Sequence, residues 1–190
     1  MNRIVLATRN KHKTEEIKTI LKDLRLEILT LNDFPDVPVL TEEGSTFREN
    51  SLQKAHAVHL YTKIPALADD SGLEVFFLNG RPGVISARYA GDGATDKENN
   101  EKLLGQMRGV APRRRGAQFR AVLTFLGDNG TEVTEGICPG RLAELPRGTN
   151  GFGYDPIFIP DGFSRTYAEL VAEEKNAISH RARALAAMRQ

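Results

Sequence analysis

The sequence predicts an α/β domain built around a mixed β-sheet, and two observations lead to this class. The chain opens with a buried-strand pattern, RIVLAT, followed by a polar turn and an amphipathic helix, which is the order expected of an open α/β sheet. Further along, two strand-like runs surround Asp-Asn-Gly at residues 128–130, which is a strong hairpin signal. A hairpin adds antiparallel strands, so the predicted sheet is mixed.

The elements of the first half follow from apolar spacing and capping residues. Ile17, Ile20 and Leu21 have the spacing of a helix, and Ser45 or Thr46 caps a second helix that has Glu49 in its first turn. The predicted elements are strand 3–8, helix 11–24, a strand and a Pro-rich loop within 26–41, helix 45–63, and a strand, polar turn and further strand within 66–83.

The second half contains a third amphipathic helix, over residues 95–109, in which Asn99, Leu103 and Met107 recur at four-residue steps. The hairpin follows at residues 117–140, then a glycine-rich loop at 145–158 and a last helix from about Glu173 to Met188. Because no internal repeat or free linker is visible, we expect a single domain over residues 1–190.

Composition excludes several classes of protein. Of the 190 residues, 26 are Lys or Arg and 25 are Asp or Glu, so the net charge of +1 gives no general attraction for nucleic acid or membranes. Any anion must therefore be bound locally. No apolar run approaches the ~18 residues that cross a bilayer. Cys138 is the only cysteine, which fits a reducing, cytoplasmic setting.

A first candidate site follows the opening strand, at the sheet edge where open α/β sheets bind ligands. Thr8, Asn10 and Lys13 lie in the turn and at the start of the helix, where backbone amides and the helix dipole favour anions such as phosphate. The competing interpretation is a capping residue beside solvated lysines. The G-x-x-x-x-G-K pattern of a Walker loop is absent.

A second candidate is acidic. Glu42 and Glu43 precede the second helix, and Asp69 and Asp70 follow an apolar strand pattern. Mg²⁺ commonly binds through one or two carboxylates together with water and substrate phosphates, so carboxylates from two loops suit it. The competing interpretation is an ordinary turn in which an aspartate caps Ser71 and the glycine after it.

A third candidate is the loop at residues 148–156, GTNGFGYDP. Its glycines let the backbone approach a ligand, Phe152 and Tyr154 could stack on a planar base, and Asp155 could accept a hydrogen bond from the base edge. As an isolated motif it is also compatible with a purely structural loop.

A fourth candidate is the last predicted helix. Lys175 and Ser179 lie four residues apart, with His180 and Arg181 near the same face. Lys175 and Arg181 could hold phosphate or base oxygens, and His180 could donate to a carbonyl. A basic helical face is, however, often only solvated.

Taken together, the motifs resemble the inosine triphosphate pyrophosphatase family, the Ham-type non-standard purine nucleoside triphosphate pyrophosphatases. Six blocks occur in that family's order and cover essentially the whole chain: ATRNKHK, EEGSTFRENSLQKA, ALADDSGLEV, RPGVISARYAG, PRGTNGFGYDPIF and EEKNAISHRARAL. Six ordered blocks are far more specific than any one of them.

The resemblance implies a Mg²⁺-dependent enzyme that hydrolyses ITP, dITP and XTP to the monophosphate and pyrophosphate. It also implies a homodimer, and a fold with an elongated central mixed sheet flanked by helices, in which two inseparable lobes enclose the active-site cleft. The expected partner is a small purine nucleoside triphosphate, with neither nucleic acid nor membrane.

Residue roles are implied by the same resemblance. Asp70 is expected to be the proton acceptor and, with Glu42, a metal ligand, although Glu43 remains an alternative to Glu42. The residues expected to bind substrate are Thr8, Asn10, Lys13, Lys54, Ser71, Phe152, Gly153, Tyr154, Asp155, Lys175, His180 and Arg181.

Two other functions remain open at this stage. The same metal site would suit a phosphohydrolase for other modified nucleotides. Alternatively, the basic loop at residues 113–115 and the FGYD motif would bind nucleotides or RNA without catalysis. The paired aspartates argue against the second function, because a binder of polyanions gains nothing from carboxylates beside its ligand.

Overall fold

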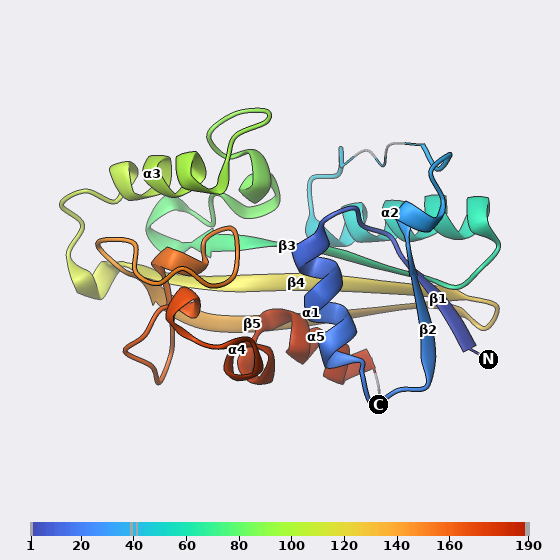
Figure 1. Cartoon of the computed structure of the whole chain (residues 1–190). Helices are drawn as coiled ribbons and strands as arrows, with labels where there is room; N and C mark the ends of the chain where they lie inside the picture. The colour runs from blue at the N-terminus through green and yellow to red at the C-terminus, as the bar shows by residue number, and fades with distance from the viewer. Residues whose placement is uncertain (1, 39, 41, 189–190) are drawn as a thin grey trace. The chain divides into compact units, whose positions relative to one another are not determined.

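The computed structural model describes residues 2–38, 40 and 42–188. Its strands are β1 (Asn2–Leu6), β2 (Leu26–Thr30), β3 (Ala66–Val75), β4 (Gly116–Gly127), β5 (Gly130–Leu142) and β6 (Phe158–Pro160). Its α-helices are α1 (Lys11–Ile20), α2 (Phe47–Thr62), α3 (Asp96–Gln106), α4 (Ala172–Ile178) and α5 (His180–Met188) (Figure 1). Among the described residues, none of the helices is both long enough and apolar enough to span a bilayer.

The strands of the described residues form one six-stranded sheet in the order β2-β1-β3-β4-β5-β6. Strand β1 pairs in parallel with β2 and with β3, whereas β5 and β6 are antiparallel. The predicted α/β class with a mixed sheet is therefore confirmed. The predicted hairpin is also confirmed, because β4 and β5 are neighbours in the sheet and only residues 128–129 separate them.

The chain divides into two compact units, each built from several segments. Unit 1 comprises Met1–Asp70, Ala121–Gly136 and Arg181–Gln190, and unit 2 comprises Ser71–Arg120 and Ile137–His180. The single domain with a cleft between two lobes, expected from the sequence, therefore stays a prediction.

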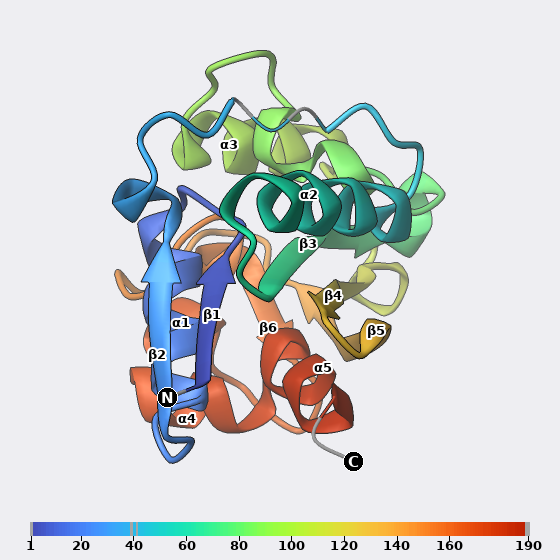
Figure 2. The same ribbon diagram turned by 90° about the vertical axis from the view of Figure 1, so that its right-hand side faces the viewer.

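Unit 1 places helices on both faces of its strands (Figure 2). Successive side chains of a strand point to opposite faces. Ile4 and Leu6 accordingly pack in one apolar cluster with residues of α1 and α5, while Val5 packs in a second cluster with residues of α2. This two-sided packing explains why Ile4, Val5 and Leu6 are apolar at successive positions, as a strand segment buried on both faces requires.

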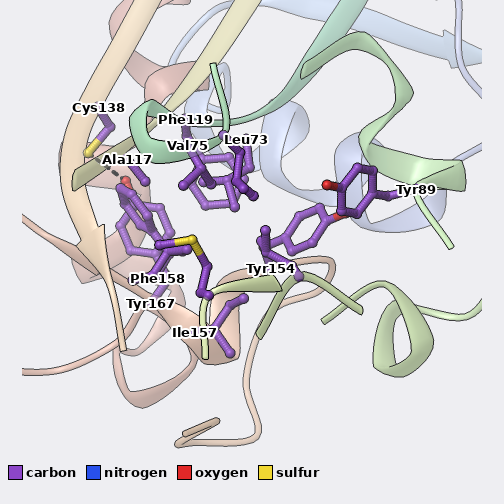
Figure 3. Close-up of a cluster of buried hydrophobic side chains, with 14 of the residues drawn as sticks. Leu73, Val75, Tyr89, Ala117, Phe119, Cys138, Tyr154, Ile157, Phe158 and Tyr167 are labelled. Atoms are coloured by element: carbon purple, nitrogen blue, oxygen red, sulfur yellow. Dashed lines mark hydrogen bonds between the residues drawn. The ribbon is translucent and has the colours of Figure 1, made fainter. Parts of the chain in front are cut away.

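Unit 2 has its own apolar core, shown in Figure 3. The ring of Phe119 packs edge-on against Phe158 at 4.8 Å and stacks on Tyr167 at 5.7 Å between ring centroids. Tyr167 donates a hydrogen bond to the sulfur of Cys138, at 2.8 Å. The cysteine is buried at 2% exposure, so it is a packing residue of this core.

Capping explains where the helices begin. Thr46 is the N-cap of α2, and its side chain and that of Glu49 form a reciprocal capping box, which confirms one of the two predicted caps. Thr95 and Glu98 do the same for α3. Helix α3 buries Leu103 completely, as its predicted apolar spacing requires.

Two predicted elements were wrong. Residues 66–75 form one continuous strand, β3, with no polar turn at the aspartates, because both carboxylates are compensated by cations distant in the sequence. The last helix is two helices, because Ser179 has extended backbone geometry (φ −67°, ψ 156°) that ends α4 before α5 begins. Lys175 and His180 therefore do not share one continuous helical face.

Candidate active site

The acidic site of unit 1 lies at the point where β3 leaves that unit. Asp69 and Asp70 are adjacent in the strand and are only 2% and 4% exposed. Neighbouring strand residues point to opposite faces, so the two carboxylates have different surroundings. Burying a charge is costly unless it is paired, and each aspartate has its own partners.

Asp69 is held by two cations. Lys13 lies 2.6 Å from its Oδ1, and Arg181 donates from Nε to its Oδ2 at 2.8 Å. Arg181 is 1% exposed and also pairs with Glu16. Burial raises the pKa of Asp69, but Arg181 and Lys13 outweigh it and hold the pKa well below the ordinary value of 3.8. Asp69 is therefore ionised at neutral pH, and its carboxylate is fixed by these two ion pairs.

Asp70 has a different balance. Lys54 lies 2.9 Å from its Oδ1, and Asn50 donates from Nδ2 to its Oδ2 at 3.1 Å. Burial raises the pKa of Asp70 above the ordinary 3.8, and the attraction of Lys54 and Lys13 offsets this only in part. A carboxylate with a raised pKa is a better proton acceptor near neutral pH than its paired neighbour.

Lys54 joins this aspartate to the acidic loop before α2. Its ammonium donates to Glu42 Oε1 at 2.7 Å and to the backbone oxygen of Asp69 at 2.8 Å. Burial lowers the pKa of Lys54, but Asp70 and Glu42 raise it above the ordinary 10.5 overall. Glu43 is exposed. Glu42 is thus the glutamate whose carboxylate meets the site.

The donor set suits Mg²⁺ when it is considered with a phosphate ligand. Glu42 and Asp70 direct oxygens toward the same cation, Lys54, so both carboxylates face one position. Within residues 2–38, 40 and 42–188 there is no group of three His, Cys, Asp or Glu side chains arranged to hold a metal ion. Mg²⁺ usually takes one or two protein carboxylates and completes its shell with water and phosphate oxygens.

The turn after β1 forms a helix start. Asn10 is the N-cap of α1 and accepts from the backbone N–H of Lys13 at 3.1 Å, while Thr8 Oγ1 accepts from the N–H of Asn10 at 3.1 Å. The capping interpretation therefore holds for Asn10. It does not exclude anion binding, because Asn10 stays exposed and this ten-residue helix directs its dipole toward the turn.

In unit 2, residues 148–156, which the sequence predicts to bind a base, form what we call the base loop. Gly148, Gly151 and Gly153 have positive φ values of 81°, 75° and 61°, which non-glycine residues adopt reluctantly. Asp155 Oδ2 accepts from the N–H of Phe152 at 2.9 Å and lies 2.5 Å from the ammonium of Lys175. The loop is therefore fixed by glycine conformation together with a buried ion pair.

Aromatic rings surround that ion pair. The Lys175 ammonium lies 4.9 Å from the ring centroid of Phe152, within cation–π range. Tyr154 is buried and donates to the backbone oxygen of Ser86 at 2.9 Å. Burial raises the pKa of Tyr154 far above its ordinary value, so this hydroxyl remains a donor.

The remaining predicted residues of unit 2 are Ser71 and His180. Ser71 is half-buried and directly follows Asp70 in β3. The imidazole of His180 stacks on Phe119 at 4.8 Å between ring centroids, with an angle of 10° between the planes. His180 is 4% exposed, so its ring is held rigidly by the core of the unit.

The predicted residues thus fall into two groups. Unit 1 brings together Lys13, Glu42, Lys54, Asp70 and Arg181, and unit 2 brings together Phe152, Asp155 and Lys175. Sequence reasoning missed Asn50 and Glu16. Asn50 lies four residues before Lys54 on α2, and this spacing was the available signal that both face Asp70.

The fold and these residues define an α/β protein with a carboxylate–lysine centre suited to a phosphorylated ligand. Comparison with known proteins identifies the group more closely. The profile of the Ham1 family matches residues 4–190, and the chain belongs to that family. The family predicted from the ordered motifs is confirmed.

Individual relatives match over nearly their whole length. The dITP/XTP pyrophosphatase of Geobacter sulfurreducens is 49% identical over 190 residues, which are 100% of this chain and 96% of the relative. The protein of the same name from Streptomyces coelicolor is 49% identical, covering 99% of this chain and 96% of the relative. The solved HAM1 protein from Coxiella burnetii superposes with a TM-score of 0.89 at 44% identity, covering 99% of this chain and 96% of that chain.

Proposed function

We propose that this protein hydrolyses the non-standard purine nucleoside triphosphates dITP, ITP and XTP to the monophosphate and pyrophosphate. Full-length relatives named dITP/XTP pyrophosphatase support this activity. The observation that best supports it within the chain is the contrast between Asp69, which is paired with Lys13 and Arg181 and has a lowered pKa, and Asp70, which is held by Lys54 and Asn50 and has a raised pKa.

Asp70 is the proposed proton acceptor. Its carboxylate takes a proton from the water that attacks the phosphate bonded to the ribose, and pyrophosphate leaves. Asn50 and Lys54 fix the orientation of this carboxylate through separate oxygens. Hydrolysis of a phosphoanhydride depends mainly on positioning and on neutralising charge, so Asp70 acts together with the cations beside it.

The phosphate chain is assigned to the cations and amides of unit 1. Lys54 and Lys13 neutralise charge on its oxygens, and the turn formed by Thr8 and Asn10 offers backbone N–H groups at the start of α1. Lys175 is assigned to phosphate as well. Arg181 and Ser71 are also proposed substrate contacts, and Arg181 pairs with Asp69 and Glu16 as well.

Mg²⁺ is the proposed cofactor, and Glu42 and Asp70 are its proposed protein ligands. When bound, the ion would neutralise phosphate charge and help to orient the attacking water. We expect chelation by EDTA to abolish turnover, and added Mg²⁺ to restore it. Turnover that survives chelation would contradict the assignment of Glu42 and Asp70 as metal ligands.

The base is assigned to the base loop and to His180. Phe152 and Tyr154 flank Gly153 and are the proposed stacking residues, while Asp155 accepts from the protonated N1 of a 6-keto purine. Adenine has an amino group at C6 and no N1 proton, so it leaves polar groups unpaired, a penalty that reaches ~10⁴-fold in sites built on hydrogen bonds. The homodimer and the cytoplasmic location stay predictions, the first of which sedimentation at several concentrations would test.

The deciding experiment is pyrophosphate release from ITP, dITP, XTP, GTP and ATP in the presence of Mg²⁺. We expect turnover of the first three and little of the last two. Guanine shares the 6-keto group and the N1 proton, so discrimination against GTP must act at its 2-amino group. Asp70→Asn should lower kcat by roughly 10²–10⁴-fold, the usual contribution of a general base. Glu43→Gln is the matched control, since Glu43 is exposed and should be dispensable.

Other outcomes would select the alternative functions. Equal turnover across the panel would indicate a phosphohydrolase for other nucleotides. Nucleotide binding that persists in EDTA without turnover would indicate a binding module. An active Asp70→Asn variant would contradict the role of Asp70 as the proton acceptor while leaving the substrate class intact.

A further inference from the structure

Helix α3 holds the base loop through contacts that no motif of the sequence identified. Asp96, the first residue of α3, accepts from the N–H of Gly153 through Oδ2 at 2.6 Å. One turn later, Asn100 donates from Nδ2 to the backbone oxygen of Gly153 at 2.7 Å. Both polar backbone groups of one loop glycine are thus bonded to one turn of one helix, and all these residues belong to unit 2.

These contacts fix the conformation of Gly153. Its N–H and its C=O belong to the two peptide groups on either side of its Cα, so holding both fixes φ and ψ together. Gly153 has φ of 61°, and glycine has more conformational freedom to lose than any other residue. Without these contacts, Gly153 would be mobile in the free protein. It would then lose conformational entropy when the ligand binds, and this loss would weaken binding.

Helix α3 does not need these side chains for its own start. Thr95 and Glu98 form the capping box, with Thr95 Oγ1 accepting from the N–H of Glu98 at 3.2 Å and Glu98 accepting from the N–H of Thr95 at 2.7 Å. Asp96 is exposed, yet its carboxylate is directed to the loop. The amide orientation of Asn100 is also defined, because Nδ2 meets a second acceptor, the backbone oxygen of Asp96, at 2.7 Å.

We propose that Asp96 and Asn100 are positioning residues for base recognition: they hold the Gly153 backbone so that Phe152 and Tyr154, on either side of it, are set for the purine. This role rests on the proposed function. The two side chains act on the base loop and not on the phosphate site. Replacing them therefore weakens the binding of nucleotides and leaves the binding of base-free polyphosphates unchanged.

The test compares Asp96→Ala with Asp96→Asn and Glu98→Ala. Asp96→Ala removes the acceptor and should raise KM for ITP roughly 10-fold, the effect of one lost hydrogen bond to a charged group. The value of kcat should stay within about 2-fold, because the proton acceptor is untouched. Inhibition by inorganic tripolyphosphate, which carries no base, should not change.

The two companion variants separate positioning from helix stability. Asp96→Asn keeps an acceptor oxygen and should retain most of the wild-type KM. Glu98→Ala removes the capping box from the same turn and should lower the melting temperature without raising KM. Asn100→Ala should raise KM at least as much as Asp96→Ala, because it leaves the oxygen of Gly153 without this donor.

Three results would overturn the proposal. These are a KM for Asp96→Ala equal to that for Glu98→Ala, an equal loss of tripolyphosphate inhibition, or no gain in hydrogen exchange at the Gly153 amide in Asp96→Ala. The exchange measurement needs no turnover. If the wild-type protein hydrolyses no triphosphate, the proposed function and the positioning role for base recognition both fail, whereas the exchange result still decides whether Asp96 orders the loop.

Discussion

At the scale of single residues, two adjacent aspartates have opposite acid–base behaviour. Burial raises the pKa of both, but only Asp69 has cations that outweigh it. For Asp69, the folded pKa lies below the unfolded value of 3.8, so its ionisation stabilises the fold at pH values above 3.8. That stabilisation is lost as the pH falls through the folded pKa.

We therefore expect Asp69→Asn to lower the free energy of unfolding at pH 7 by about 3–5 kcal/mol, the cost of breaking a buried ion pair. The variant leaves Arg181 buried with one partner fewer. Urea unfolding at pH 7 and at pH 3 checks this, and the difference from wild type should shrink only below about pH 4, the unperturbed range of an aspartate. A difference that is the same at both pH values would contradict the pKa argument.

Asp70 gives a second prediction, on activity. Its pKa is raised, so this proposed proton acceptor becomes protonated at a higher pH than an ordinary carboxyl group does. The acid limb of kcat/KM for ITP should lie above pH 3.8.

Asp70 also gives a prediction on stability. Asp70→Asn should lower the free energy of unfolding less than Asp69→Asn does, because burial disfavours the ionised form of Asp70. A larger loss for Asp70→Asn would contradict this order.

At the scale of elements, strand β3 depends on Gly72, which lies two residues after Asp70. A Cβ at Gly72 would lie 2.4 Å from Ser86 Oγ and 2.5 Å from the backbone oxygen of Gly83, which is far inside contact distance. Ser86 Oγ also accepts from the N–H of Leu73 at 3.0 Å. The 3₁₀ helix Gly83–Arg88 is thus packed directly on this strand.

Gly72→Ala should lower the free energy of unfolding by about 1–3 kcal/mol, as overpacking usually does. The matched control is Gly105→Ala in α3, where a Cβ meets no atom within 4 Å. That change should stabilise the protein by about 0.5–1 kcal/mol, since alanine favours helix. Thermal unfolding of both variants measures the two changes in stability. Equal changes for Gly72→Ala and Gly105→Ala would contradict the packing argument.

Elements also show how far the sequence leads. Helix starts and the hairpin were predictable because Thr46 and the Asp-Asn-Gly turn act on their immediate neighbours. The continuity of β3 was not, because two adjacent aspartates favour a turn locally and their compensating cations come from distant segments. Likewise, a serine inside a helical pattern does not reveal that the backbone is extended at Ser179.

The candidate site, like the fold, was predictable from the sequence only in part. Strand ends and helix starts pointed to Lys13 and Asp70, whereas the choice of Glu42 over Glu43 needed the contact with Lys54. The contact between Asp96 and the base loop could not be predicted from the sequence. Gly153 is distant from Asp96 in the sequence, and a backbone N–H is present at almost every residue, so its partner has no characteristic residue type.

At the scale of the whole molecule, the two units are interleaved along the chain. The chain passes from one unit to the other at Asp70–Ser71, Arg120–Ala121, Gly136–Ile137 and His180–Arg181. The first three of these points lie within β3, β4 and β5, respectively. Unfolding one unit alone would therefore interrupt the hydrogen bonding of strands that continue into the other.

We expect a single cooperative unfolding transition as a consequence. The buried tyrosines Tyr89, Tyr154 and Tyr167 all belong to unit 2, so tyrosine fluorescence reports mainly on that unit. Leu123→Ala in unit 1 and Leu73→Ala in unit 2 remove fully buried side chains and should each cost about 2–5 kcal/mol.

The decisive comparison is the urea midpoint of tyrosine fluorescence in Leu123→Ala. If the units unfold together, a cavity in unit 1 must lower the urea midpoint measured by the fluorescence of the tyrosines in unit 2. The urea midpoint measured by far-ultraviolet circular dichroism should fall by the same amount. Leu73→Ala provides the reference shift for a cavity in the tyrosine-containing unit itself. A fluorescence midpoint that Leu123→Ala leaves unchanged would mean that unit 2 unfolds independently, and the expectation of one inseparable domain would then be wrong.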